Sequence, residues 1–161
     1  MMNRPSFTAL LLASICLLAS TGCSQRDKVV EVADDDPEMV AAIAKARASL
    51  PQFWEVFDRH SEGDSDFALK VKITDANGTE HFWATDLQRS GGKTTGTINN
   101  DPNTVKKVKL GDRIEIPEAD VSDWLYMRGG KMYGNYTLKP LFKSMPAAEV
   151  EKLKAIMAEP E

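Results

Sequence analysis

The feature that most restricts the fold of this chain is an alternation of residue types after position 66. Its apolar members are Phe67, Leu69, Val71 and Ile73, and the residues between them are Ala68, Lys70, Lys72 and Thr74. Successive side chains of a β-strand point to opposite faces of a sheet, so this strand has one buried and one solvated face. Asn77-Gly78 follows and predicts a hairpin turn, because both residue types tolerate positive φ. The alternation therefore predicts an antiparallel sheet.

Turn residues divide the remaining central part of the chain into further strands. The expected strands are 79–88, 94–99, 113–116, 121–127 and 131–137. Gly129-Gly130 separates the last two strands and predicts a second hairpin.

Helical periodicity occurs on both sides of the strands. An acidic run ending at Asp36 precedes Pro37. This order predicts a helix start, because a carboxylate accepts hydrogen bonds from the first amides and proline fits the first helical turn. We expect this helix over 37–50, a shorter one from Pro51 to about residue 60, and further helices over 138–143 and 144–158.

Together these elements predict an α+β fold. We expect N-terminal helices packed on a bent, mostly antiparallel sheet, and a short C-terminal helix. The sheet either stays open or closes into a small barrel, because periodicity does not distinguish the two. Phe53, Trp54 and Phe57 share one helical face, which packs on the sheet or lines a ligand groove.

Residues 1–22 have the composition of a secretory signal. Arg4 supplies basic charge, and an apolar run over 7–19 follows that is short for a membrane span. Small residues then lead to Cys23, an arrangement that resembles the lipobox of bacterial lipoproteins. The resemblance implies cleavage before Cys23 and lipidation of its thiol. Ordinary secretion to the periplasm and an uncleaved anchor are the alternatives.

Lipidation of Cys23 predicts a location and an arrangement of the mature chain. Cys16 leaves with the signal, so no free thiol remains in an oxidising compartment. Each buried methylene of an acyl chain contributes about 0.8 kcal/mol to membrane binding. Ser24 follows the cysteine, and lipoproteins without Asp at that place resemble those of the outer membrane. We expect a charged, lipid-anchored linker over 23–36 and a single domain over 37–161 at the periplasmic face.

The charge balance excludes some classes of partner. Without the signal the chain has 19 basic and 24 acidic side chains, a formal charge of about −5. An acidic chain argues against nucleic-acid binding and against electrostatic docking on anionic lipid.

Six short motifs follow one another along the strands and turns. They are Asp66-Phe67-Ala68-Leu69-Lys70-Val71-Lys72, Glu80-His81-Phe82-Trp83, Thr97-Ile98-Asn99-Asn100-Asp101-Pro102, Gly111-Asp112, Ser122-Asp123-Trp124-Leu125-Tyr126 and Gly134-Asn135-Tyr136-Thr137. In this order they resemble the YegJ-like family, domain of unknown function 2314, over about 39–142. The resemblance implies a bacterial protein of unassigned biochemical role, and it supplies no catalytic residues.

One group of candidate binding residues lies on the first expected hairpin. His81 and Trp83 share a strand face, which also carries Lys70 of the neighbouring strand. This face suits an anionic or planar ligand. Alternatively, His81 acts as a general base with Glu80 or Asp123 in an envelope hydrolase or transferase. A third interpretation is that His81 only fixes the sheet.

The second group lies on the second expected hairpin. The Gly129-Gly130 turn brings Asp123 and Trp124 beside Asn135 and Tyr136. The two aromatic rings then line one concave face, and the two polar side chains orient a ligand. In the structural alternative, Asp123 caps a turn, Asn135 adopts a left-handed conformation, and Thr137 caps the following helix.

No metal or cofactor is expected. His60 and His81 are the only histidines, and Cys23 is assigned to lipid, so neither ligand count nor spacing fits zinc. The oxygen-rich run at 99–103 lacks the glycine and late glutamate of a calcium loop. We therefore expect a non-enzymatic binding or accessory module of the envelope, with a protein or cell-wall component as its partner.

Overall fold

The structure is a computed structural model that describes residues 36–158. The predicted signal peptide, the lipidation site Cys23 and almost all of the predicted linker lie outside the described residues.

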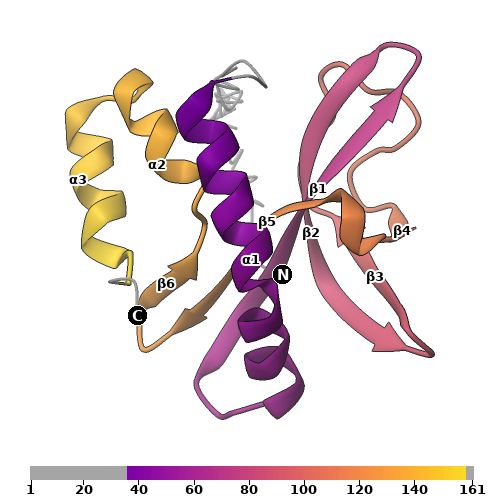
Figure 1. Cartoon of the computed structure of the whole chain (residues 1–161), viewed down its shortest axis with the longest axis horizontal. Coiled ribbons are helices and arrows are strands. Elements are labelled where there is room, and N and C mark those ends of the chain that lie inside the picture. The colour runs from indigo at the N-terminus through magenta and orange to yellow at the C-terminus, as the bar shows by residue number, and fades with distance from the viewer. Residues whose placement is uncertain (1–35, 159–161) are drawn as a thin grey trace, which may run out of the picture.

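The described residues form helices around an antiparallel sheet (Figure 1). In chain order the elements are α1 (Pro37–Arg59), β1 (Asp64–Asp75), β2 (Gly78–Ser90), β3 (Lys93–Ile98), β4 (Arg113–Glu115), the 3-10 helix η1 (Glu118–Asp120), β5 (Val121–Arg128), β6 (Lys131–Gly134), α2 (Leu138–Leu141), the 3-10 helix η2 (Phe142–Ser144) and α3 (Ala147–Ile156). The α+β prediction is confirmed.

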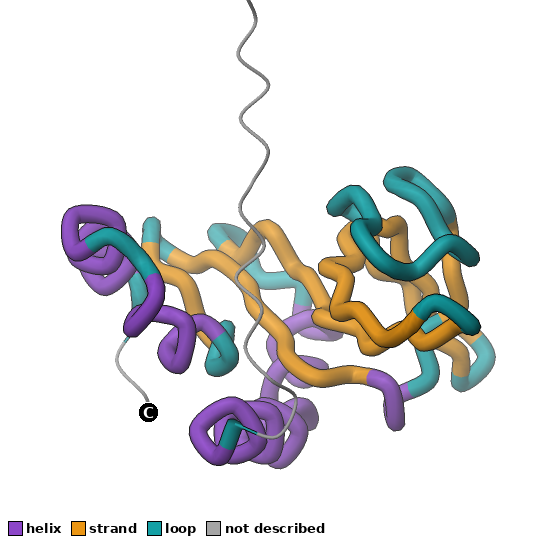
Figure 2. The backbone as a smooth tube through the Cα atoms, turned by 90° about the horizontal axis from the view of Figure 1, so that it is seen from above, coloured by secondary structure: helices purple, strands orange, loops and turns teal. Residues whose placement is uncertain are grey.

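The six strands lie in the order β4-β3-β2-β1-β5-β6, and every neighbouring pair is antiparallel. The sheet is bent but open, with β4 and β6 at its two edges, so it does not close into a barrel. Figure 2 shows α1 on one side of the strands and the C-terminal helices gathered at one end of the sheet.

Helix α1 is a single helix rather than the two that were predicted. It begins as expected, because Asp36 Oδ1 accepts hydrogen bonds from the amides of Glu38 and Met39 at 2.8 and 3.1 Å. It does not end at Pro51, although proline removes one amide donor from the helical ladder. Leu50 and Phe53 flank this position and are buried, so packing on the sheet holds the helix together across the proline.

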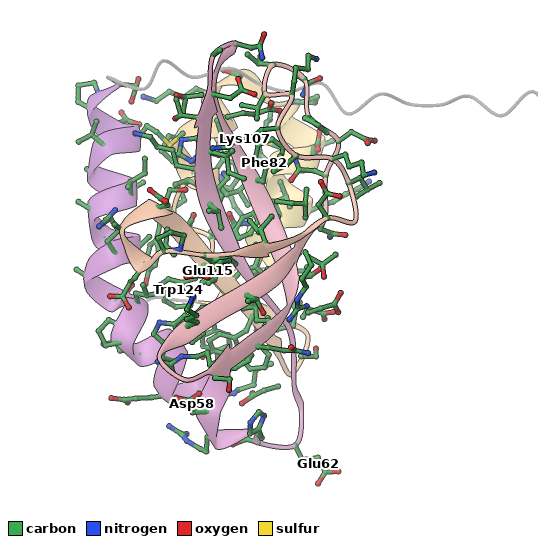
Figure 3. All side chains as sticks on the ribbon, turned by 90° about the vertical axis from the view of Figure 1, so that its right-hand side faces the viewer. Asp58, Glu62, Phe82, Lys107, Glu115 and Trp124 are labelled. Carbon is green, nitrogen blue, oxygen red and sulfur yellow. The ribbon has the colours of Figure 1, made fainter. Side chains whose placement is uncertain are left out.

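The core forms where α1 packs on the sheet. Leu69, Val71 and Phe82 are almost fully buried from the sheet side, and Figure 3 labels Phe82 among the strands. This burial confirms the predicted alternation from Leu69 onward, but Ala68, predicted on the solvated face, is buried because the β1–β5 register shifts just before it. Phe53 of α1 contacts the rings of Phe67 and Trp124, with centroids 5.8 and 5.5 Å apart. Burial of one such aromatic side chain contributes roughly 1.5–3 kcal/mol.

The C-terminal helix is shorter than predicted and only partly buried. Val150 of α3 is buried, whereas Ile156 is 39% exposed. The reason is that α3 lies beside β6 rather than on the sheet face (Figure 1). The chain after α3 adds to the edge of the sheet, since Met157 forms a parallel bridge with Met132 and the amide of Ala158 donates to Met132 O at 2.8 Å.

Two carboxylates of the β1–β2 hairpin hold the loop between β3 and β4. Glu80 accepts hydrogen bonds from the amides of Asn103, Thr104 and Val105 at 3.0–3.2 Å. Burial opposes ionisation of Glu80, but these amides outweigh it and lower its pKa. Val105 is thereby fixed in the core with no exposed surface.

Asp75 holds the next part of the same loop. Its carboxylate accepts hydrogen bonds from the amides of Lys106, Asn77 and Lys107, and the Lys106 bond contributes most to lowering its pKa from 3.8 to about 2.

Because the pKa of Asp75 is lower in the folded than in the unfolded chain, its ionised form stabilises the fold above pH 3.8. That contribution disappears as the pH falls through about 2. We therefore expect Asp75→Asn to lower the melting temperature at pH 7 and to differ little from wild type near pH 2. Thermal unfolding followed by circular dichroism over this pH range measures the difference. A constant difference at all pH values would contradict the assignment, and Asp101→Asn, an exposed change in the same loop, is the control.

Candidate functional site

The predicted face of the first hairpin exists in the structure. Lys70 pairs with Trp83 and Lys72 with His81 in the β1–β2 register, on the face opposite Phe82. The Lys70 ammonium lies 5.3 Å from the centroid of the Trp83 ring and donates a hydrogen bond to Thr137 Oγ1 at 2.9 Å. Three of the predicted candidates, Lys70, His81 and Trp83, are thus half-buried neighbours.

A β-bulge in β5 completes this face. Lys70 pairs with Asp123 and Val71 with Val121, so Ser122 is an extra residue without a partner in β1. As a result Ser122 contacts His81, and Asp123 contacts Thr137, which is the hydrogen-bond partner of Lys70. Sequence reasoning missed Ser122 because regular alternation places it on the opposite face from Asp123.

Asp123 is fully buried and anchors the turn before α2. Its carboxylate accepts hydrogen bonds from the Thr137 amide and hydroxyl, both at 2.7 Å, and from the Tyr136 amide at 3.2 Å. Thr137 therefore uses its hydroxyl to join Lys70 to Asp123, and it does not cap α2 with its side chain. This network fastens the C-terminal part of the chain to the centre of the sheet.

Burial dominates the titration of the charged ends of this network. It lowers the pKa of Lys70, and the nearby Asp123 charge opposes that effect. It raises the pKa of Asp123, although the hydrogen bonds from Thr137 and Trp124 and the Lys70 charge act in the other direction. The attraction between Lys70 and Asp123 therefore favours the charged form of each group against the effect of burial.

The imidazole of His81 contacts the hydroxyl of Ser122, the kind of pair that a hydrolase with a serine nucleophile would use. His81 Nδ1 lies 2.8 Å from Ser122 Oγ, and Ser122 Oγ lies 3.2 Å from Lys70 O. The carbonyl oxygen can only accept, so when Ser122 Oγ–H donates to Lys70 O, His81 Nδ1–H donates to the serine. A general base needs the opposite direction of donation. Ser122 is also only 4% exposed, and Glu80 and Asp123 engage the amides described above.

A separate groove lies between α1, the β5–β6 hairpin and the C-terminal helices. We call it the tyrosine groove; its volume is about 410 Å³. It is lined by Lys45, Gln52, Glu55, Val56, Arg59, Trp124, Tyr126, Arg128, Tyr133, Gly134, Tyr136, Lys139, Met157 and Ala158. Two of the predicted candidates, Trp124 and Tyr136, are among these residues.

Stacked aromatic rings form one wall of the tyrosine groove. Tyr126 and Tyr133 pair across the hairpin with centroids 4.9 Å apart and rings tilted by only 4°. Trp124 stacks on Tyr126 at 6.0 Å, and Tyr136 meets Trp124 edge-on at 5.6 Å. Lys45 lies 5.1 Å above the Tyr136 ring. The sequence predicted the meeting of Trp124 and Tyr136 but not the two further tyrosines.

Trp124 itself belongs mainly to the core. It is 5% exposed, and its indole Nε1–H donates to Ala46 O of α1 at 3.0 Å (Figure 3). Asn135 has the left-handed conformation expected for it, with φ of 51°, and its amide group contacts Met132 Sδ at 3.4 Å. Asn135 and Asp123 thus do not line the tyrosine groove.

Two further features, a metal-binding cluster and a membrane-spanning helix, are absent from residues 36–158. In this part of the chain, no three or more His, Cys, Asp or Glu side chains gather closely enough to hold a metal ion. None of the helices described here is both long and apolar enough to cross a bilayer.

Comparison with known proteins agrees with the motif resemblance. Residues 36–157 match the family described as an uncharacterized protein conserved in bacteria, DUF2314. The chain belongs to this family. It is 40% identical over 147 residues to the uncharacterized protein YegJ of Escherichia coli strain K12, which covers 91% of this chain and 95% of YegJ.

A second similar protein is longer. The putative ankyrin repeat protein NMB1133/NMB1171 of Neisseria meningitidis serogroup B is 30% identical over 133 residues. The match covers 76% of this chain and 52% of that protein, so this chain spans about half of its length. No solved structure shows a significant match.

We expect the Lys70–Thr137–Asp123 network to behave as one energetic unit. Lys70→Met and Asp123→Asn should each destabilise the fold by about 2–4 kcal/mol, because each leaves a buried partner without its counterpart. The double variant should lose less than the sum of the two, by about 1 kcal/mol or more. Urea unfolding of the four proteins in the cycle measures this coupling. Additive losses would contradict a shared network, and Lys72→Met, an exposed change on the same face, is the control.

Proposed function

We propose that this chain is an envelope lipoprotein, anchored through Cys23, whose folded part is a non-enzymatic binding module. Its ligand is an anionic molecule with ring-shaped units, of the class of acidic cell-wall glycans, and it binds in the tyrosine groove. The observation that carries this proposal is the combination of aromatic rings and cationic side chains around one groove.

The charge of the groove supports an anionic ligand. Four basic side chains and one acidic side chain, Glu55, line a groove in a chain with a net charge of −4. Arg128 is ion-paired with Asp64, which leaves Lys45, Arg59 and Lys139 in excess over Glu55. Attraction between charges is stronger in a partly covered groove than in bulk water, so this excess favours carboxylate or phosphate groups.

The aromatic wall supports a ligand that contains rings. Tyrosine offers a large rigid surface with a polar tip, so it binds apolar ring faces and hydrogen-bonding groups together. Tyr133 and Tyr136 are half-buried on the groove wall, and their hydroxyl groups suit a hydroxyl-rich ligand such as a sugar. The volume of about 410 Å³ lies within the range of small-ligand sites.

Binding to isolated peptidoglycan sacculi tests the ligand class. We expect the full chain to co-sediment with sacculi, and Lys45→Glu or Tyr133→Leu to weaken binding about tenfold, equivalent to about 1.4 kcal/mol. Increasing salt should weaken binding, because charge pairs contribute.

Lys152→Glu is the matched control, since it makes the same charge change at an exposed position of α3 outside the groove. Equal loss with Lys152→Glu and Lys45→Glu would show that only overall charge matters. An absence of co-sedimentation by the wild-type chain would exclude the proposed ligand class.

Membrane anchoring is tested separately. Cys23→Ser removes the thiol that carries the lipid, so the full chain should move from the membrane fraction to the periplasmic fraction of fractionated cells. Immunoblotting of the fractions measures the shift. If the variant stays with the membranes, an uncleaved signal anchor replaces lipidation as the explanation, and Cys16→Ser controls for loss of a cysteine.

A further inference from the structure

The sheet divides into two parts at its centre. Strands β1 and β2 pair from Asp75 and Gly78 as far as Leu69 and Ala84. Beyond that point, residues 64–68 of β1 pair only with β5, and residues 85–90 of β2 pair only with β3. Figure 1 shows the strand pairs β2–β3 and β5–β6 running in different directions. We call the space between the separated strands the fork.

Two β-bulges at matching positions accompany this separation. The β1–β5 register shifts between Ser65 and Ala68, and the β2–β3 register shifts between Thr85 and Gln88. Each bulge contains an aspartate with positive φ, 54° at Asp66 and 48° at Asp86. Bulges bend strands, and a left-handed residue other than glycine costs about 1–2 kcal/mol, so both strands hold strained backbone at the fork.

A cavity of about 630 Å³ occupies the fork. It is lined by Phe57, Asp66, Phe67, Ala68, Trp83, Thr85, Asp86, Leu87, Asn99 and Leu125. Helix α1 contributes Phe57 and is joined to the β2 side, because Arg89 pairs with Asp58 at 2.6 Å and lies 4.3 Å above the Trp54 ring. The fork therefore has a fixed apolar wall from the helix and two strand segments beside it.

The two strand segments make the fork suitable for a peptide. A β-strand has two hydrogen-bonding edges, so one edge of residues 64–68 and one edge of 85–90 are directed toward the fork rather than toward a neighbouring strand. An extended segment of about five residues, roughly 16 Å long, matches these segments. Its alternate side chains would meet the apolar lining, as in other cases of strand addition.

The charge of the lining indicates which peptide fits. Asp66 and Asp86 are exposed and acidic, and none of the described residues that line the cavity is basic. The nearby Lys70 directs its ammonium to Thr137, away from these carboxylates. The fork thus has the opposite charge to the tyrosine groove.

We propose that the fork binds an extended peptide segment of a protein partner, in which apolar side chains alternate with basic ones. The backbone of the peptide bonds to the edges of β1 and β2, and its basic side chains pair with Asp66 and Asp86. The fork and the tyrosine groove share no lining residue.

Three synthetic peptides test the proposal on the full chain in detergent micelles. KVTVKVTVK has the required alternation, EVTVEVTVE reverses its charge, and KVTPKPTVK removes two amide donors while keeping the lysines. We expect calorimetric titration to show binding of the first peptide and at least tenfold weaker binding of the other two. Amide NMR shifts on binding should be confined to the segments at 64–68 and 85–90.

Matched variants test the role of the aspartates. Asp66→Asn combined with Asp86→Asn removes both charges while keeping residues that tolerate positive φ, so the fold should be retained. This variant should bind KVTVKVTVK about fivefold to tenfold more weakly at low salt, whereas Asp101→Asn and the groove variant Lys45→Glu should bind it normally.

Three outcomes would overturn the proposal. The first is no binding of KVTVKVTVK, and the second is equal binding of the basic and acidic peptides. The third is equal binding of the peptide that contains proline, which would indicate an apolar-ligand site that does not use the strand edges.

Discussion

The packing of helix α1 holds the two parts of the sheet in one structure, because Phe53 contacts one part and Asp58 pairs with the other. The Phe53 ring has no exposed surface and contacts Phe67 of β1 and Trp124 of β5. Five residues further along α1, Asp58 pairs with Arg89 of β2. Since β1 and β2 separate beyond Leu69, this helix replaces the missing ladder hydrogen bonds with side-chain contacts. The fork forms where α1 spans the opened part of the sheet, and the tyrosine groove lies between the same helix and the β5–β6 hairpin.

The β-bulges determine on which face of the sheet several polar side chains lie. In a regular β5, Ser122 and Asp123 would point to opposite faces, and the hydroxyl would be lost from the polar side. The extra residue brings both toward Lys70, where they make hydrogen bonds to His81 and Thr137. Bulges in β1 and β2 likewise place Asp66 and Asp86 at the fork. Irregular positions of this sheet thus supply Ser122, Asp66 and Asp86.

Much of the fold could be predicted from the sequence, because the signals were local. The alternation around Leu69, the Asn77-Gly78 turn and the Asp36 cap each depend on a few neighbouring residues. The continuation of α1 through Pro51 depends on contacts with distant strands and could not be predicted. The tyrosine groove likewise combines residues from α1, β5, β6 and α2, whose spacing in sequence has no period.

The C-terminal turn of α1 is a wall shared by both cavities. Phe57 faces the fork, while Val56 and Arg59 line the tyrosine groove. A ligand that displaced this turn from one side would change the shape of the cavity on the other. Occupancy of the two cavities would then be thermodynamically linked, each ligand altering the affinity for the other by the same factor. A single helical turn would thus couple two ligands of opposite charge in this small protein.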